Sequence, residues 1–115
     1  MKISRGAVVR VLFPNSNLRT SKRRPALVVQ ADQLGTGLPQ TIVAMITGNL
    51  NRTGHPSRVA VSVTSPEGIT AGLRTDSVIM TDNLVTVAET EIDSVIGTLP
   101  NMTAVDACLR KTLGL

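Results

Sequence analysis

Two apolar segments, PALVVQ at residues 25–30 and TIVAMIT at residues 41–47, decide the fold of this chain. Each has the length of a single strand, and a nearly continuous apolar run is typical of a strand that is buried on both faces. Residues 31–40, which separate the two segments, include two glycines and a proline and are typical of a connection. We therefore expect two consecutive strands of one sheet.

These two strands are expected to form an antiparallel hairpin in which Gln30 lies opposite Thr41. In that register Arg24 lies opposite Thr47. Directly opposed side chains share a face, with Cβ atoms about 4.5–5.5 Å apart, whereas a slip of one residue would separate them. Pro25 biases Arg24 toward an extended backbone. An arginine anchored there is able to bind a phosphate through two parallel hydrogen bonds, beside the Thr47 hydroxyl.

The rest of the chain shows short strands, polar loops and one helix. The expected strands are residues 7–13, 58–63, 77–80, 84–87 and 95–99, and the expected loops and turns are residues 15–24, 48–57 and 65–75. Residues 101–113 are expected to form a helix, because Met102, Val105, Leu109 and Leu113 follow helical spacing. Asn101 is its expected N-cap and Gly114 its expected end. Cys108 is expected to be a small core residue. The pattern predicts one mainly β domain over residues 1–115 with a C-terminal α-helix, built as a small, partly open barrel or sandwich.

The charge is unevenly distributed along the 115 residues. Residues 1–58 contain nine Lys and Arg and one acidic residue, whereas residues 59–115 contain three Lys and Arg and seven acidic residues. The halves therefore carry about +8 and −4. This asymmetry indicates a polyanionic partner such as nucleic acid; a solvated basic surface is the alternative.

Several classes of protein do not fit the sequence. No apolar run has the roughly 18–20 residues of a membrane helix, and the first residues lack a secretory signal. Cys108 is the only cysteine, which fits a reducing cytosol, so we expect a cytoplasmic protein without membrane association. No His, Cys and carboxylate cluster has the spacing of metal ligands, so neither a metal nor another cofactor is expected.

An arginine beside a hydroxyl suits the cleavage of RNA. The ribose 2′-OH already lies next to its phosphodiester, so the substrate supplies the nucleophile and the protein must orient it and stabilise the anionic phosphorus. The expected products are a 2′,3′-cyclic phosphate and a 5′-OH, without a metal ion. The alternative is that Arg24 is a surface arginine and Thr47 an ordinary strand residue.

Two polar loops supply further candidates for RNA binding. They leave the same end of the predicted hairpin, and the candidates in or beside them are Arg19, Lys22, Arg23, Asn49, Arg52, His55 and Arg58. Phosphate contacts from such residues make binding depend on salt. Each of these residues is otherwise a solvated polar side chain, His55 is a candidate proton shuttle, and Asn49 either reads a base or turns its loop. Phe13 is expected in the core, which leaves no aromatic surface for stacking bases.

Six segments in order resemble the MazF/PemK (Kid) family of toxin endoribonucleases over nearly the whole chain. They are RGAVV at residues 5–9, RRPALVV at 23–29, IVAMIT at 42–47, DSVIM at 76–80, IGTL at 96–99 and ACLRKTLGL at 107–115. The resemblance implies a small SH3-like, CcdB/PemK-like β-barrel that forms a homodimer. It also implies metal-independent cleavage of single-stranded RNA, neutralisation by a cognate antitoxin, and functional roles for Arg24 and Thr47.

Two departures from the family pattern affect what the resemblance implies. Residues 18–23 lack the Glu-Gln-Gly-Gly stretch that often precedes the family's arginine, so loop conformation and base preference are open. Met80 stands where some members carry a second arginine, while Asp82 keeps their acid, so a mechanism without that arginine is expected. Related barrels inhibit DNA gyrase instead, and an inactive SH3-like RNA-binding module is a third alternative. Retention of both Arg24-Pro25 and Thr47 favours the nuclease.

Overall fold

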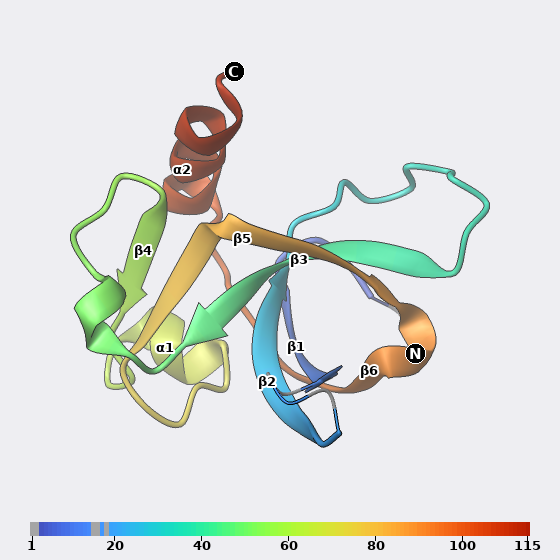
Figure 1. The fold of residues 1–115 in the computed structure, drawn as a ribbon. Coiled ribbons are helices and arrows are strands. Elements are labelled where there is room, and N and C mark those ends of the chain that lie inside the picture. Colours follow the sequence, from blue (N-terminus) through green and yellow to red (C-terminus); the bar gives the residue numbers. More distant parts are fainter. Residues whose placement is uncertain (1–2, 15–16, 18) are drawn as a thin grey trace.

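The computed structural model describes residues 3–14, 17 and 19–115, and its described part forms a six-stranded antiparallel sheet with short helices at its periphery (Figure 1). The strands follow the order β4-β5-β3-β2-β1-β6 across the sheet. Their bounds are β1 Ala7–Pro14, β2 Ser21–Val28, β3 Gln40–Thr47, β4 Arg58–Val61, β5 Ser77–Ala88 and β6 Ile92–Thr98. The helices are η1 Leu50–Arg52, α1 Pro66–Thr70, η2 Glu89–Glu91 and α2 Thr103–Leu113. The predicted mainly β architecture with a C-terminal helix is confirmed.

The central hairpin has the predicted register. Ala26 pairs with Met45, Leu27 with Ala44 and Val28 with Val43, which is the alignment that also sets Gln30 opposite Thr41. Side chains alternate between two buried clusters, one on each face of the sheet. Leu27, Ala44 and Ile46 belong to one cluster, and Ala26, Val43 and Met45 belong to the other. The prediction that both strands are buried on both faces is therefore confirmed.

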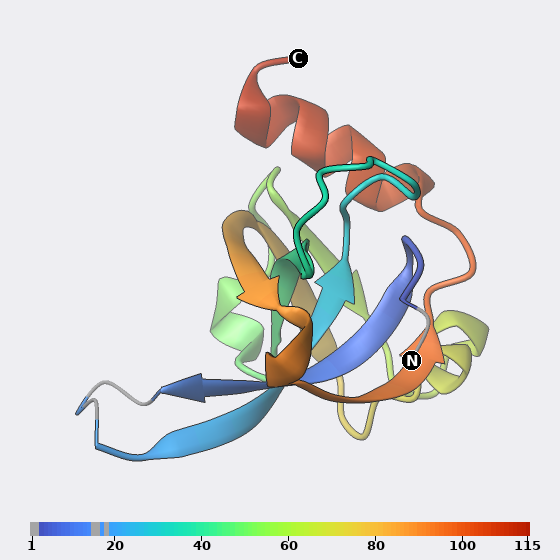
Figure 2. The same cartoon turned by 90° about the vertical axis from the view of Figure 1, so that its right-hand side faces the viewer.

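The strands β2 and β3 separate beyond this short ladder. The ladder ends at Ala26 and Met45, next to Pro25, which has no backbone N–H to continue it. From there β2 stays paired with β1 and projects with it from the body of the molecule (Figure 2), whereas β3 continues along β5. The separation leaves a notch between the start of β2 and the end of β3.

Several elements differ from the sequence-based expectation. Strand β2 begins at Ser21, so part of the expected loop over residues 15–24 is strand, held by pairs such as Lys22 with Phe13. Strand β5 is continuous instead of two strands; the expected break survives as a register shift, since Ala44 pairs with Leu84 but Met45 pairs with Met80. Helix α1 interrupts the segment that was expected to contain only turns.

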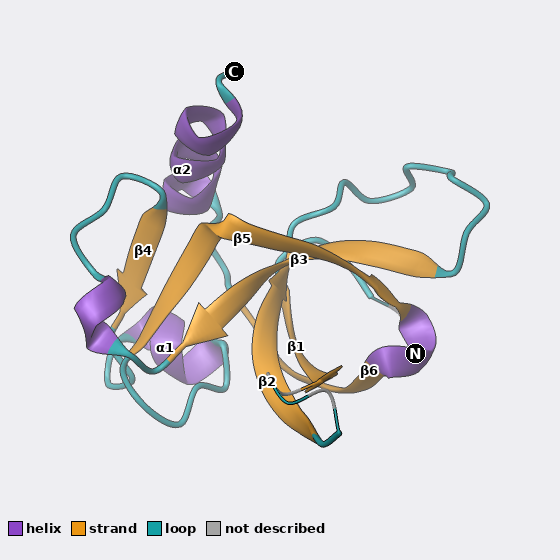
Figure 3. Ribbon diagram, viewed as in Figure 1, coloured by secondary structure: helices purple, strands orange, loops and turns teal. Residues whose placement is uncertain are grey.

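Helix α2 packs at the β4–β5 side of the sheet (Figure 3), and Val105 enters one of the buried clusters as predicted. The helix begins later than expected, because Met102 is its N-cap while the Asn101 side chain accepts a hydrogen bond from Thr103 N. Gly114 ends it at φ 72°, which confirms the predicted terminator. Leu113 is 54% exposed, so the last position of the helical spacing is not buried. No helix in the described part of the chain has the length and apolarity needed to cross a membrane.

Candidate active site

Arg24 and Thr47 lie on opposite sides of the notch between β2 and β3. Arg24 is exposed and pairs with Val11 of β1, while Thr47 is half-buried and pairs with Val78 of β5. Both residues continue the register of Ala26 and Met45, so their side chains project from the same face. The expected shared face is therefore found, but a cleft between the diverging strands takes the place of a direct cross-strand pair.

Two cavities meet at this pair. The larger, here called the basic cleft, has a volume of about 720 Å³ and is lined by Arg10, Lys22, Arg23, Arg24, Pro25, Ile46, Thr47, Gly48, residues 72–75, Ser77 and Ile96. The smaller, here called the apolar groove, has a volume of about 350 Å³ and is lined by Phe13, Arg24, Met45, Ile46, Thr47, Met80, Asn83 and Val85. Arg24 and Thr47 line both cavities, and so does Ile46 between them in the sheet. A ligand at the pair therefore has access to both sides.

The hydroxyl of Thr47 is oriented by the loop that follows it. The backbone N–H of Asn49 donates to Thr47 Oγ1 at 3.1 Å. Because this contact uses an acceptor site of the oxygen, the hydroxyl proton stays available to a ligand. The Asn49 side chain in turn accepts from Asn51 N at 3.1 Å and caps helix η1. The turn-forming role left open for Asn49 is thus observed, and base reading stays a prediction.

The cations of the basic cleft are mostly unneutralised. Within the described part of the chain, only Arg23 of the cleft's five cations is in an ion pair, through Nε at 3.2 Å from Asp93 Oδ1. That pair is exposed on both sides and contributes little to stability. Arg10, Lys22, Arg24 and Arg74 have no carboxylate partner among the residues that the structure describes. The cleft is therefore a region of positive potential suited to an anionic ligand.

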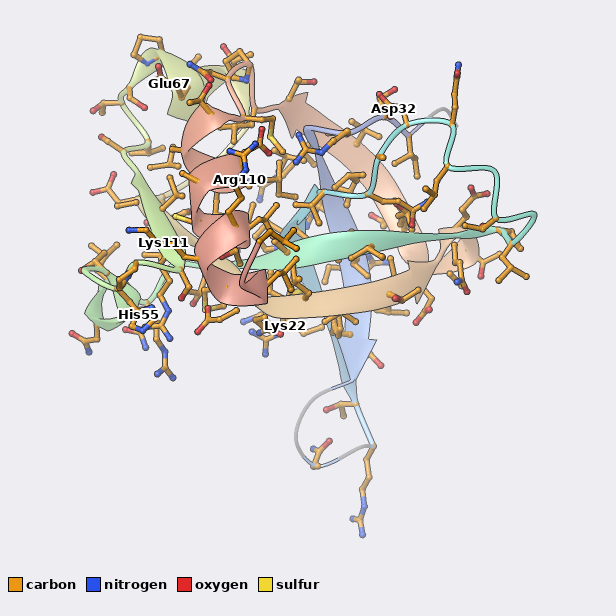
Figure 4. The ribbon with its side chains drawn as sticks, turned by 90° about the horizontal axis from the view of Figure 1, so that it is seen from above. Lys22, Asp32, His55, Glu67, Arg110 and Lys111 are labelled. Carbon is orange, nitrogen blue, oxygen red and sulfur yellow. The ribbon has the colours of Figure 1, made fainter. Side chains whose placement is uncertain are left out.

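Of the predicted RNA-binding residues, Lys22 and Arg23 line the basic cleft, whereas Arg19, Asn49, Arg52, His55 and Arg58 line neither cavity. Arg19 is exposed; Asn15, Ser16 and Leu18 of the same expected loop lie outside the described residues. His55 lies beside η1 at the edge of the molecule (Figure 4), where its Nδ1 accepts from Ser57 N at 3.1 Å. A role for these five residues stays a prediction.

Arg58 is engaged in a local ion pair. Its Nη2 lies 2.8 Å from Asp82 Oδ2, and its Nη1 donates to the Arg52 carbonyl oxygen at 3.3 Å. The hydrogen bond from Arg58 is the main reason why the pKa of Asp82 lies below its usual value, against the opposing effect of burial. Asp82 is thus held in its ionised form and neutralised by Arg58.

Sequence reasoning missed several residues that line the cavities. Arg10 and Arg74 come from β1 and from the segment after α1, and neither stood in a polar loop next to the predicted pair. Phe13 was expected in the core, but it is half-buried and lines the apolar groove. A signal for Phe13 did exist, because the register of β1 and β2 pairs it with Lys22, on the same face as Arg24. The described residues contain no group of three His, Cys, Asp or Glu side chains placed to hold a metal ion.

A six-stranded antiparallel sheet with a terminal helix places this chain among small, mainly β proteins, and Arg24 and Thr47 lie at a cleft whose described lining contains five cations. Residues 4–113 match the family model described as PemK-like, MazF-like toxin of type II toxin-antitoxin system, and the chain belongs to this family.

Relatives and solved structures agree with this family. The chain is 35% identical over 107 residues to Endoribonuclease MazF6 of Mycobacterium tuberculosis and to Endoribonuclease MazF2 of Mycobacterium bovis, covering 90% of each chain compared. Its fold is similar to an endoribonuclease in complex with its cognate antitoxin from a mycobacterial species, with a TM-score of 0.74, 22% identity, and coverage of 99% of this chain and 97% of that one. The MazE–MazF structure from Deinococcus radiodurans gives a TM-score of 0.73 at 18% identity, over 100% and 98% of the two chains. These structural similarities concern the fold.

Proposed function

We propose that this chain is a toxin endoribonuclease that cleaves single-stranded RNA, with Arg24 and Thr47 at the cleaved bond. The observation that carries the proposal is that these two residues line both cavities at the notch, in a region of unpaired cations. The names of the relatives, Endoribonuclease MazF6 and MazF2, agree with this activity. RNA supplies both the anionic charge and the nucleophile that such a site requires.

The reaction is a transfer of the phosphoryl group within the substrate. The ribose 2′-oxygen loses its proton and bonds to phosphorus while the bond from phosphorus to O5′ breaks, and O5′ takes up a proton. The products are a 2′,3′-cyclic phosphate and a 5′-OH, so no water or metal ion enters the balance.

In this reaction Arg24 stabilises the negative charge on the non-bridging phosphate oxygens. A guanidinium stays protonated and offers parallel N–H donors, so it matches two oxygens of one phosphate. Thr47 donates its hydroxyl proton to a phosphate oxygen, since Asn49 N already occupies an acceptor site of Oγ1. Donors that are fixed before the reaction stabilise the developing charge without reorganisation.

Substrate binding extends beyond this pair. Lys22 and Arg23 contact neighbouring phosphates from the start of β2. Further contacts come from the flanking loops, from η1 and from the start of β4, through Arg19, Asn49, Arg52, His55 and Arg58. A cognate antitoxin neutralises the toxin, as in the solved complexes of an endoribonuclease with its antitoxin and of MazE with MazF. The toxin acts as a homodimer in the cytoplasm, where its RNA substrate is found.

Incubation of the purified protein with single-stranded RNA in EDTA, followed by mapping of the fragment ends, tests the proposal. We expect fragments with 2′,3′-cyclic phosphate and 5′-OH ends. Arg24→Ala should abolish cleavage while circular dichroism and melting temperature stay unchanged, because Arg24 is exposed. Arg110→Ala removes an exposed arginine of α2 (Figure 4) and is the matched control. Unchanged cleavage by Arg24→Ala, or trapping of DNA gyrase without RNA degradation, would contradict the proposal.

A further inference from the structure

The basic cleft and the apolar groove lie on two sides of one notch, and they differ in chemistry. The cleft contains five cations, whereas the groove is lined mainly by Phe13, Met45, Met80 and Val85, with Asn83 as a polar group. Only Arg24, Ile46 and Thr47 are common to the two linings. An extended ligand that is held at Arg24 is thus able to enter both.

We propose that one RNA strand passes through the notch, so that the nucleotides on the two sides of the cleaved bond occupy different cavities. In the basic cleft, Arg10 and Arg74 hold the phosphate of a flanking nucleotide. The proposal rests on the proposed function and extends it, because it assigns the path of the substrate and two binding residues that the sequence did not indicate.

Charge and burial favour a phosphate between Arg10 and Arg74. Arg10 is half-buried on β1, opposite Pro25, and neither arginine has a carboxylate partner among the described residues. An unpaired guanidinium that is partly removed from water gains more from an anionic ligand than an exposed one. Leu73 and Ile96 line the same cleft and offer an apolar surface for a base. Its volume of about 720 Å³ lies within the range of roughly 300–1,000 Å³ that is usual for ligand sites.

Part of the lining of the cleft is fixed by a close approach of two backbones, since Gly72 and Ile96 both line it. Gly72, at φ 72°, follows α1, and Gly97 belongs to β6. A Cβ on Gly72 would overlap the carbonyl of Ile96, and a Cβ on Gly97 would overlap the carbonyl of Ala71. Because only glycine permits this contact, Gly72 is held against β6 at a defined position, and Arg74 follows it two residues later in the chain. The cleft is therefore a built part of the fold.

The position of the cleft favours RNA over an acidic peptide. Thr47 and Arg24 belong to its lining, so a ligand in the cleft is continuous with the phosphate at the cleaved bond. A polynucleotide places a charge at each nucleotide and a flat base between charges, which matches the cations and the apolar side chains that line the cleft.

Binding of a non-cleavable RNA tests the path. The probe is a fluorescent RNA that carries the mapped cleavage sequence with a 2′-deoxy nucleotide at the cleaved position, titrated at several KCl concentrations. Arg10→Ala and Arg74→Ala should each weaken binding about tenfold and reduce the slope of log K against log salt by about 0.7, as expected for one phosphate contact of single-stranded RNA. Arg110→Ala should change neither quantity. Arg74 is exposed in a loop, so its variant remains informative if Arg10→Ala fails to fold.

Trimming of a cleavable substrate, one nucleotide at a time from each end, gives a second readout. Removal of the nucleotide that occupies the cleft should lower kcat/KM of the wild-type protein more than that of Arg74→Ala, because the two losses concern the same contact. The inference would be overturned if the wild type cleaves RNA and the binding and trimming profiles of Arg74→Ala are identical to those of Arg110→Ala. The proposed function would still stand in that case. A wild-type protein that cleaves no RNA overturns both. Weaker binding of a polyglutamate peptide by Arg74→Ala, with RNA binding unchanged, would assign the cleft to a protein partner instead.

Discussion

Replacement of Thr47 by valine tests whether its hydroxyl acts on the substrate. Valine has nearly the shape of threonine and the same β-branched side chain, so β3 and its pair with Val78 should be retained. The substitution removes one oxygen that now accepts from Asn49 N at 3.1 Å and that is half-exposed at the notch. The change is therefore confined to hydrogen bonding.

The size of the effect follows from the charge of the proposed partner. A hydrogen bond to a charged group contributes about 1.5–3 kcal/mol, and each 1.4 kcal/mol corresponds to a factor of ten. Thr47→Val should therefore lower kcat/KM by about ten- to 150-fold. Stability should fall by less than about 1 kcal/mol, because Asn49 is exposed and water replaces the lost acceptor. The melting temperature should then change by no more than about 4 °C.

Initial rates of cleavage of a fluorogenic RNA, measured together with thermal melts, separate the two effects. Thr47→Ser keeps the hydroxyl and is the matched control, with kcat/KM expected within a few-fold of the wild type. A Thr47→Val variant that cleaves at the wild-type rate would refute the role of the hydroxyl. A large loss in Thr47→Ser together with full activity in Thr47→Val would show that the methyl group, and therefore packing, matters instead.

Three further predictions concern the surroundings of the pair. Gly97→Ala should lower the free energy of unfolding in urea by about 1–3 kcal/mol, because its Cβ meets the Ala71 backbone. A Cβ on Gly48 has its nearest neighbour at 3.4 Å, so the stability of the control Gly48→Ala should stay close to that of the wild type. Stacking of the Phe13 ring on a base predicts that Phe13→Leu weakens binding of the non-cleavable RNA about five- to 150-fold. Phe13→Tyr keeps an aromatic ring and should retain binding. Equal binding by the two variants would exclude stacking. Because Arg58 lowers the pKa of Asp82 from 3.8, their pair adds stability above that pH, and this stability is lost as the pH falls toward the lowered value. Asp82→Asn should therefore reduce stability at neutral pH and flatten its loss in acid, and urea midpoints that shift equally at pH 7 and pH 3 would contradict this.

The central hairpin was predictable because its information is local. The two apolar runs have the length of strands and follow one another in the chain, so they fit one hairpin, in which Leu27 pairs with Ala44 and Val28 with Val43. The residues beside Pro25 are also local, so the positions of Arg24 and Thr47 on one face followed from the same register. Helix α2 was predictable for the corresponding reason, since its apolar spacing and Gly114 lie within one segment.

The cavities were not predictable because they depend on packing between distant segments. The first residues of β2 are polar and show no apolar alternation, and only their pairs with β1 extend them into a strand. Helix α1 has five residues, too few for a periodic signal. The basic cleft needs the contact between Gly72 and β6, which joins residues 24 positions apart along the chain. No pattern within one segment indicates that Arg74 and Arg10 line one cleft.

The resemblance to the family and the structure together identify the source of the positive charge at the Arg24–Thr47 pair. Met80 stands where some family members carry an arginine, and across β5 and β4 it pairs with Arg58. Arg58 therefore places a guanidinium on the strand next to Met80, but Asp82 neutralises it at 2.8 Å. Neither Arg58 nor Asp82 lines the basic cleft or the apolar groove. Arg24 is the one cation among the residues common to both linings. In the proposed mechanism, stabilisation of the negative charge on the phosphate oxygens therefore depends on Arg24 of β2. A lysine at this position, which keeps the charge but not the paired donors, should not restore full activity.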